Sequence, residues 1–112
     1  MTTKIKTNLL TATLFGLCAT SAYADENDIL VYARQSAIIA GGAQYCRADE
    51  DMIDEFVSKA EARIAYLAKD DYEKVLGKLE FKNVLAGASA KEPQKGCDAF
   101  VSDFEQTVRD AR

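Results

Sequence analysis

The sequence contains no histidine, and this absence excludes more functions than any other feature. Imidazole is the usual proton carrier near neutral pH, the base in serine and cysteine nucleophile pairs, and the commonest ligand of zinc and copper. The serines also lack the glycine-flanked context of a nucleophile elbow. We therefore expect a protein that is not an enzyme, with no catalytic residue, no metal site and no cofactor.

Proline is nearly absent as well, with Pro93 as the single copy. Proline interrupts helices, so its scarcity favours long uninterrupted ones. The chain has no strong alternating strand pattern, no internal repeat and no low-complexity tract. These features predict an all-α fold, a compact bundle of about four helices with one disulfide.

Long hydrophobic runs are missing too. The main apolar stretch, residues 9–19, has about 11 residues, whereas a helix that spans a bilayer needs roughly 20. Lys4 and Lys6 precede it, and the small residues Ala22 and Ala24 follow it, which is the order of a cleavable secretory signal. We expect no membrane anchor to remain after cleavage.

Cleavage there makes residues 1–24 a signal peptide and leaves residues 25–112 as a single helical domain, periplasmic or secreted, in a bacterium. Cys18 is lost with the leader, which leaves Cys46 and Cys97. An exported domain meets an oxidising compartment, so the sequence predicts a disulfide between these two residues. The bridge would close a loop of about 50 residues in a domain too small to have much stability to spare.

The charge balance is acidic. Without Lys4 and Lys6, the mature chain has 12 basic and 18 acidic residues, a net charge of −6. Nucleic acid and anionic lipid would be repelled at long range, so neither is an expected partner. We expect the partner to be another protein with a basic surface.

Apolar residues recur with helical spacing in four segments: residues 28–46, 49–68, 70–91 and 97–111. The first segment is apolar on almost every side, which is typical of a central helix. It also contains Gly41 and Gly42, and glycine inside a helix costs about 1 kcal/mol relative to alanine. We interpret the pair as the point where a neighbouring helix approaches closely, with a kink as the alternative.

The third segment changes its apolar face partway along. Tyr72 and Leu79 lie roughly opposite Phe81 and Leu85 at 100° per residue. We interpret the segment as one helix that touches different neighbours at its two ends. A break between Gly77 and Asn83 is the alternative.

Two groups of side chains could contact a partner. The densest charge cluster surrounds the start of the second helix and consists of Asp49, Glu50, Asp51, Asp54 and Glu55. It lacks the alternating ligands and glycine turn of a calcium loop, so we interpret it as a solvated helix start with Asp49 as N-cap, and otherwise as a face for a basic partner.

The second group is a pair of tyrosines, Tyr66 and Tyr72, which flank the joint between the second and third helices. Tyrosine is enriched in binding hot spots, so this corner is a candidate partner surface. The interpretation that we favour is that these two tyrosines, like Tyr32 and Tyr45, are half-buried residues at the edge of the core.

The layout of an export signal followed by a short acidic helical domain, with Cys46 and Cys97 about 50 residues apart, resembles in outline the periplasmic acid-stress chaperones. It also resembles the small helical immunity proteins that protect bacteria from secreted cell-wall amidases. These resemblances transfer no functional residue. We expect a small exported protein-binding or stress-related accessory protein; the alternatives are an acid-activated chaperone and an immunity or inhibitor protein against a secreted enzyme.

Overall fold

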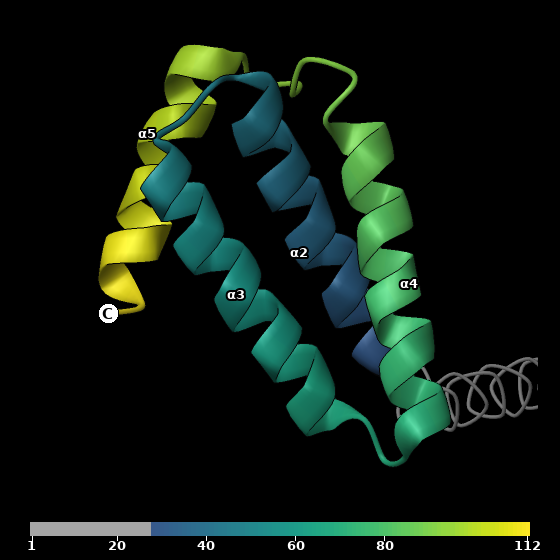
Figure 1. The fold of residues 1–112 in the computed structure, drawn as a ribbon. Helices are drawn as coiled ribbons and strands as arrows, with labels where there is room; N and C mark the ends of the chain where they lie inside the picture. The colour runs from purple at the N-terminus through teal and green to yellow at the C-terminus, as the bar shows by residue number, and fades with distance from the viewer. Residues whose placement is uncertain (1–27) are drawn as a thin grey trace, which may run out of the picture.

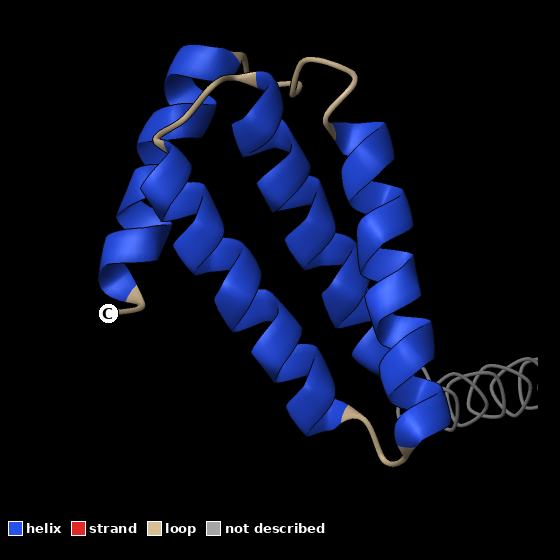
Figure 2. Cartoon of the chain, in the orientation of Figure 1, coloured by secondary structure: helices blue, strands red, loops and turns tan. Residues whose placement is uncertain are grey.

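The computed structural model describes residues 28–112, which form four helices: α2 (Asp28–Tyr45), α3 (Glu50–Leu67), α4 (Asp71–Ala88) and α5 (Cys97–Asp110). Within that range there is no strand (Figure 2), so the all-α prediction is confirmed. α2 lies between α3 and α4, and α5 flanks α3 on its other side (Figure 1). The predicted signal peptide, residues 1–24, lies outside the described residues.

Aspartates begin two of the helices, because a carboxylate can accept hydrogen bonds from the free N–H groups of a first turn. Asp49 caps α3 by accepting from the backbone N–H of Met52 at 3.1 Å, as the sequence predicted. Asp70 caps α4 by accepting from the N–H of Glu73 at 2.8 Å. The Glu73 carboxylate accepts in return from the N–H of Lys69 at 2.9 Å, so both sides of this joint are fixed.

α2 ends in a Schellman motif directly after the first bridging cysteine. Arg47 adopts a positive φ of 57°, and the N–H of Ala48 donates to the carbonyl of Ala43 at 3.0 Å. Glycine usually occupies the left-handed position, so Arg47 adopts a conformation that costs about 1–2 kcal/mol for other residues. The motif turns the chain sharply into α3 within a few residues.

α2 is the central helix, as its all-round apolar character predicted. It packs against each of the other three described helices, most extensively against α4. Its buried residues are nearly all small: Ile29, Ala33, Ser36, Ala37, Ala40, Gly41, Gly42 and Ala43. Small side chains let neighbouring backbones come close, and the larger apolar side chains are supplied by the surrounding helices.

The apolar residues bury themselves in two clusters along α2. One lies among α2, α3 and α4 and includes the fully buried Ile64 and Phe81. The other lies among α2, α3 and α5 and includes Phe104 and Val108. Phe56 of α3 packs against both clusters and meets Phe104 edge to face, with ring centroids 5.6 Å apart. The two clusters are therefore joined through α3.

The close approach inferred for the glycine pair is confirmed. A Cβ atom added at Gly41 would lie 2.5 Å from the Cβ of Ala88 and 2.9 Å from the backbone oxygen of Leu85 on α4. A Cβ atom at Gly42 would lie 2.5 Å from the ring of Phe100 on α5. Each glycine thus admits a different neighbour, and α2 continues through both without a break.

Replacing Gly41 by alanine tests this packing. The added methyl group would meet the backbone of α4, so we expect Gly41→Ala to lower the free energy of unfolding by about 1–3 kcal/mol. Gly87→Ala is the matched control, because nothing lies within 4 Å of a Cβ at that position and alanine is the better helix former. Denaturant unfolding should show the control as stable as the parent or more so; equal effects of the two substitutions would contradict the close approach.

Candidate functional site

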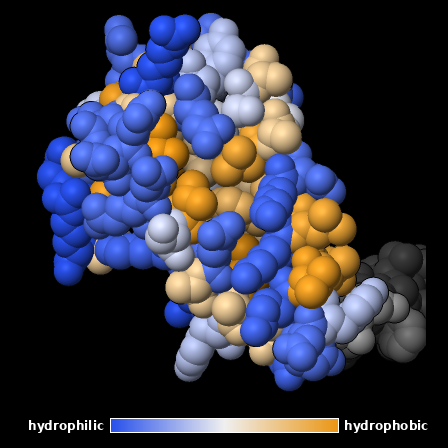
Figure 3. All heavy atoms as spheres, viewed as in Figure 1, coloured by the Kyte–Doolittle hydropathy of each residue, from blue (hydrophilic) through white to orange (hydrophobic). Residues whose placement is uncertain are grey.

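The outer side of α4 carries a strip of exposed apolar side chains: Tyr72, Val75 and Leu79. Their exposed fractions are 74%, 65% and 53%, although valine and leucine are among the residues most often buried. They are spaced i, i+3 and i+7, so they form one continuous line along the helix. Figure 3 shows hydrophobic residues gathered on this side of α4. We call these three residues the α4 strip.

The α4 strip corrects part of the sequence interpretation. α4 is one continuous helix, as preferred over a break between Gly77 and Asn83. Its two apolar faces were expected to touch different neighbours, but only the face with Gly77 and Phe81 is buried. The strip has no such neighbour within residues 28–112. The change of apolar face in the sequence thus indicates an exposed apolar surface and not a second packing contact.

The tyrosine corner lies at the α3–α4 joint, as predicted. Tyr66 is 80% exposed, and the guanidinium of Arg63 lies 5.9 Å from its ring centroid. Tyr72 belongs both to this corner and to the α4 strip. The favoured interpretation of half-buried edge tyrosines is therefore wrong for Tyr66, Tyr72 and Tyr45, which are exposed, whereas Tyr32 is half-buried.

A second feature is a partly open apolar hollow of about 810 Å³ between α2, α4, the connection 89–96 and the start of α5. Ile38, Val84 and Phe100 supply its larger apolar surfaces. It exists because α5 packs on α2 and α3 and makes no extensive contact with α4. The connection 89–96 lines part of the space between α4 and α5. It contains the only proline of the chain.

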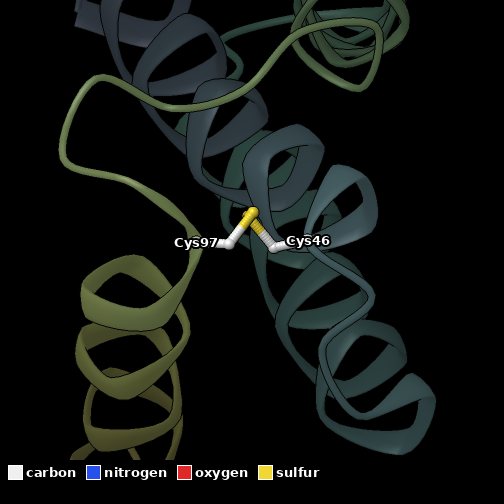
Figure 4. The surroundings of a disulfide bond; sticks show 2 residues. All are labelled: Cys46 and Cys97. Atoms are coloured by element: carbon white, nitrogen blue, oxygen red, sulfur yellow. A yellow bond between two sulfur atoms is a disulfide. The ribbon is translucent and has the colours of Figure 1, made fainter.

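The disulfide between Cys46 and Cys97 holds this arrangement, as the sequence predicted. Cys46 directly follows α2, Cys97 begins α5, and their Cα atoms are 5.3 Å apart (Figure 4). The two cysteines are 51 residues apart in the sequence, and a closed loop of that length reduces unfolded-state entropy by an amount worth about 4 kcal/mol. The bridge therefore keeps α5 attached to the end of α2 beside the hollow.

The acidic cluster lies at the disulfide end of α3, and its members have different roles. Asp49 is engaged as the N-cap, while Glu50 and Asp51 are exposed in the first turn. Among residues 28–112, no three His, Cys, Asp or Glu side chains come together as they would to hold a metal ion. The helix-start interpretation thus accounts for Asp49, and the exposed carboxylates form a solvated negative face.

Glu55, the last member of the cluster, connects α3 to the C-terminus. Its carboxylate accepts from Nε and Nη2 of Arg112 at 3.2 and 3.1 Å, and from Nζ of Lys59 at 3.4 Å. The hydrogen bond from Arg112 is the largest cause that holds the pKa of Glu55 below its ordinary value. Desolvation opposes it, and the charge of Arg112 and the hydrogen bond and charge of Lys59 lower the pKa further. Lys59 also donates to the carbonyl of Ala111 at 3.1 Å.

The structure separates the two predicted contact groups. The acidic residues Asp49, Glu50, Asp51, Asp54 and Glu55 lie at the N-terminal end of α3, whereas Tyr66 lies near its C-terminal end and Tyr72 follows the next joint. A helix of 18 residues is about 27 Å long, so one small contact area cannot include both groups. The charge cluster and the apolar α4 strip are distinct surfaces.

None of the described helices is long and apolar enough to cross a bilayer. Comparison with protein-family models, curated proteins and solved structures finds no match for this chain. The outline resemblances to acid-stress chaperones and immunity proteins therefore stay predictions.

The Glu55 contacts predict a pH dependence. A carboxyl group whose pKa is lowered by folding stabilises the protein at pH values above its ordinary pKa of 4.5. This contribution is lost as the pH falls through the lower pKa of the folded state. We expect Glu55→Gln to lose less stability than the parent between about pH 6 and about pH 3. Thermal melts across that range measure the difference. Glu50→Gln, at a carboxylate with no ion pair in residues 28–112, is the control; parallel curves for the parent and Glu55→Gln would contradict the assignment.

Proposed function

We propose that the mature domain is a small exported, non-enzymatic protein that binds another protein, in the bacterial periplasm or after secretion. The observation that carries this proposal is the α4 strip, with Tyr72, Val75 and Leu79 exposed together. Contiguous exposed apolar side chains on a small domain mark interaction surfaces, since leaving them in water is unfavourable. The disulfide supports an oxidising compartment, and the predicted leader provides the route to it.

The geometry of the strip favours a helical partner segment. An i, i+3, i+7 line is the seam along which two helices pack, with each apolar side chain inserted between those of the partner. Full burial of a side chain such as Val75 or Leu79 contributes about 1.5–3 kcal/mol. Tyr72 adds an aromatic side chain of the kind that dominates binding energy at many interfaces.

Charge determines the kind of partner. The net charge of −6 on the mature chain attracts a protein with a basic surface and accelerates its association. The exposed carboxylates of Glu50, Asp51 and Asp54 form the most concentrated part of this field. They lie away from the α4 strip, so we assign them to long-range attraction and the strip to affinity. Inhibition of a secreted enzyme would be one form of this function.

Substitution within the strip tests the proposal. We expect the parent domain to capture a partner from periplasmic extract with saturation at micromolar concentration, and Leu79→Glu to weaken that binding at least about tenfold, the loss expected for a hot-spot residue. Val31→Glu, at an exposed valine on α2, is the matched control and should bind as the parent does. Circular dichroism confirms that both variants are folded.

Two outcomes contradict the proposal. One is the absence of any saturable partner at micromolar concentration. The other is equal capture by the parent and Leu79→Glu, because the strip would then contribute nothing to binding.

A second candidate, an acid-activated chaperone, is favoured by the ion pairs between helices. Arg34 of α2 pairs with Glu80 of α4 at 2.8 Å, and Arg112 pairs with Glu55 of α3 at 3.1 Å. Protonation of these carboxylates removes both attachments, while the mature charge changes from −6 to about +12 and the helices repel one another. The disulfide would keep the loosened chain connected.

Client protection in acid separates the two candidates. An acid-activated chaperone should suppress aggregation of a client protein at about pH 2–3 and lose that activity at neutral pH, because protonation loosens the bundle and exposes the apolar core between the helices. Light scattering of the client with and without the domain provides the measurement. A domain that stays folded in acid, or that unfolds without protecting the client, eliminates this second candidate.

A further inference from the structure

The hollow between α4 and α5 is a separate surface from the α4 strip. Val84 and Gly87 line it from one side of α4, whereas Val75 and Leu79 point to another at 100° per residue. The protein-binding proposal therefore does not use the hollow. Its function has to be derived from its own shape and charge.

The shape suits a small molecule. The volume of about 810 Å³ lies within the range of roughly 300–1,000 Å³ that is typical of ligand sites. Ile38 comes from α2, Val84 from α4 and Phe100 from α5, so apolar surface surrounds the space on several sides. The ring of Phe100 rests against Gly42, where a Cβ would leave no room for it. A concave space of this kind accommodates an apolar chain and not a flat partner surface.

The charges at the hollow are mostly positive, although the domain as a whole is acidic. Three charged residues line it, Lys91, Glu92 and Lys95. Lys91 is exposed and forms no ion pair within residues 28–112. Lys95 binds Asp103 at 2.6 Å, but both side chains are more than half exposed, so the ammonium group can still meet an anion. The two lysines therefore favour a negative group beside the apolar space.

We propose that this hollow binds a free long-chain carboxylate, with its hydrocarbon chain against Ile38, Val84 and Phe100 and its carboxylate beside Lys91 and Lys95. The apolar lining supplies the affinity through the hydrophobic effect. The lysines select an anionic head over a neutral one. An anionic membrane surface carries many charges, so the net charge of −6 repels it more strongly than it repels a single carboxylate, and the ligand is the free carboxylate and not a lipid within a bilayer.

Gly87 allows the hollow to be filled without disturbing the fold. Gly87 lines the hollow, and nothing lies within 4 Å of a Cβ at this position. A leucine side chain there would therefore occupy the space in which the ligand is proposed to bind. Leucine is also a better helix former than glycine, so Gly87→Leu should be at least as heat-stable as the parent. We expect it to bind dodecanoate at least about tenfold more weakly.

The experiment is a titration of the disulfide-bonded mature domain with dodecanoate below its micellar concentration, followed by NMR shifts and calorimetry. Shifts should be confined to the lining residues of the hollow. Ala86→Leu is the matched control, because it adds the same side chain one residue earlier on an exposed side of α4 and should bind as the parent does. Ile38→Asp is a second blocking variant at a half-exposed position and should also weaken binding about tenfold.

Two further arms test the head group and the source of the ligand. Dodecanol has the same chain without the charge and should bind about threefold more weakly than dodecanoate, the effect of an exposed charge contact. Anionic phospholipid vesicles should not bind. Saturable dodecanoate binding that both blocking variants reduce and Ala86→Leu does not would support the proposal.

Other outcomes overturn it. The hollow is not the site if Gly87→Leu and Ile38→Asp bind as the parent does, or if shifts centre on Tyr72, Val75 and Leu79. If dodecanol binds as tightly as dodecanoate, the hollow does not select a carboxylate. If anionic vesicles bind, the ligand is not limited to a free carboxylate. Failure here leaves the protein-binding proposal intact, because that proposal depends on Leu79 and not on Gly87.

Discussion

The close packing of α2 against its three neighbours is the constraint on which the rest of the structure depends. α2 buries alanines and glycines almost exclusively, so the neighbouring helices approach its backbone. Ala88 of α4 packs against Gly41, and Phe100 of α5 packs against Gly42, on different sides of the same helix. A side chain at either position would separate one neighbour from α2, so these two adjacent residues determine where α4 and α5 lie.

In this arrangement α4 and α5 both pack on α2 but do not pack extensively on each other. The disulfide attaches α5 to the end of α2, and the connection 89–96 crosses from α4 to α5 over the space that remains. The rest of the interior consists of two clusters of buried apolar residues, and Phe56 packs against both. The hollow is thus a consequence of the same contacts that hold the bundle together.

The surfaces of the domain divide the chemistry of binding among separate places. The α4 strip offers apolar area, the start of α3 offers negative charge, and the hollow offers a partly open apolar space with two lysines. Affinity for a protein comes from desolvated apolar and aromatic side chains, whereas dispersed charge acts mainly on encounter rates. In the proposed function, one end of α3 attracts the partner and the outer side of α4 binds it.

Sequence alone determined the helices, the bridge and the central position of α2, because each depends on local spacing, capping residues or residue type. The periodicity located all four helices of residues 28–112, Asp49 marked the start of α3, and the predicted cleavage left only Cys46 and Cys97 to pair. An apolar residue stays exposed when no other helix packs against it. The periodicity of the sequence does not specify which helices pack against which faces. For that reason the exposure of Val75 and Leu79, the distance between the acidic cluster and Tyr66, and the hollow beside Phe100 were decided only when α3, α4 and α5 packed around α2.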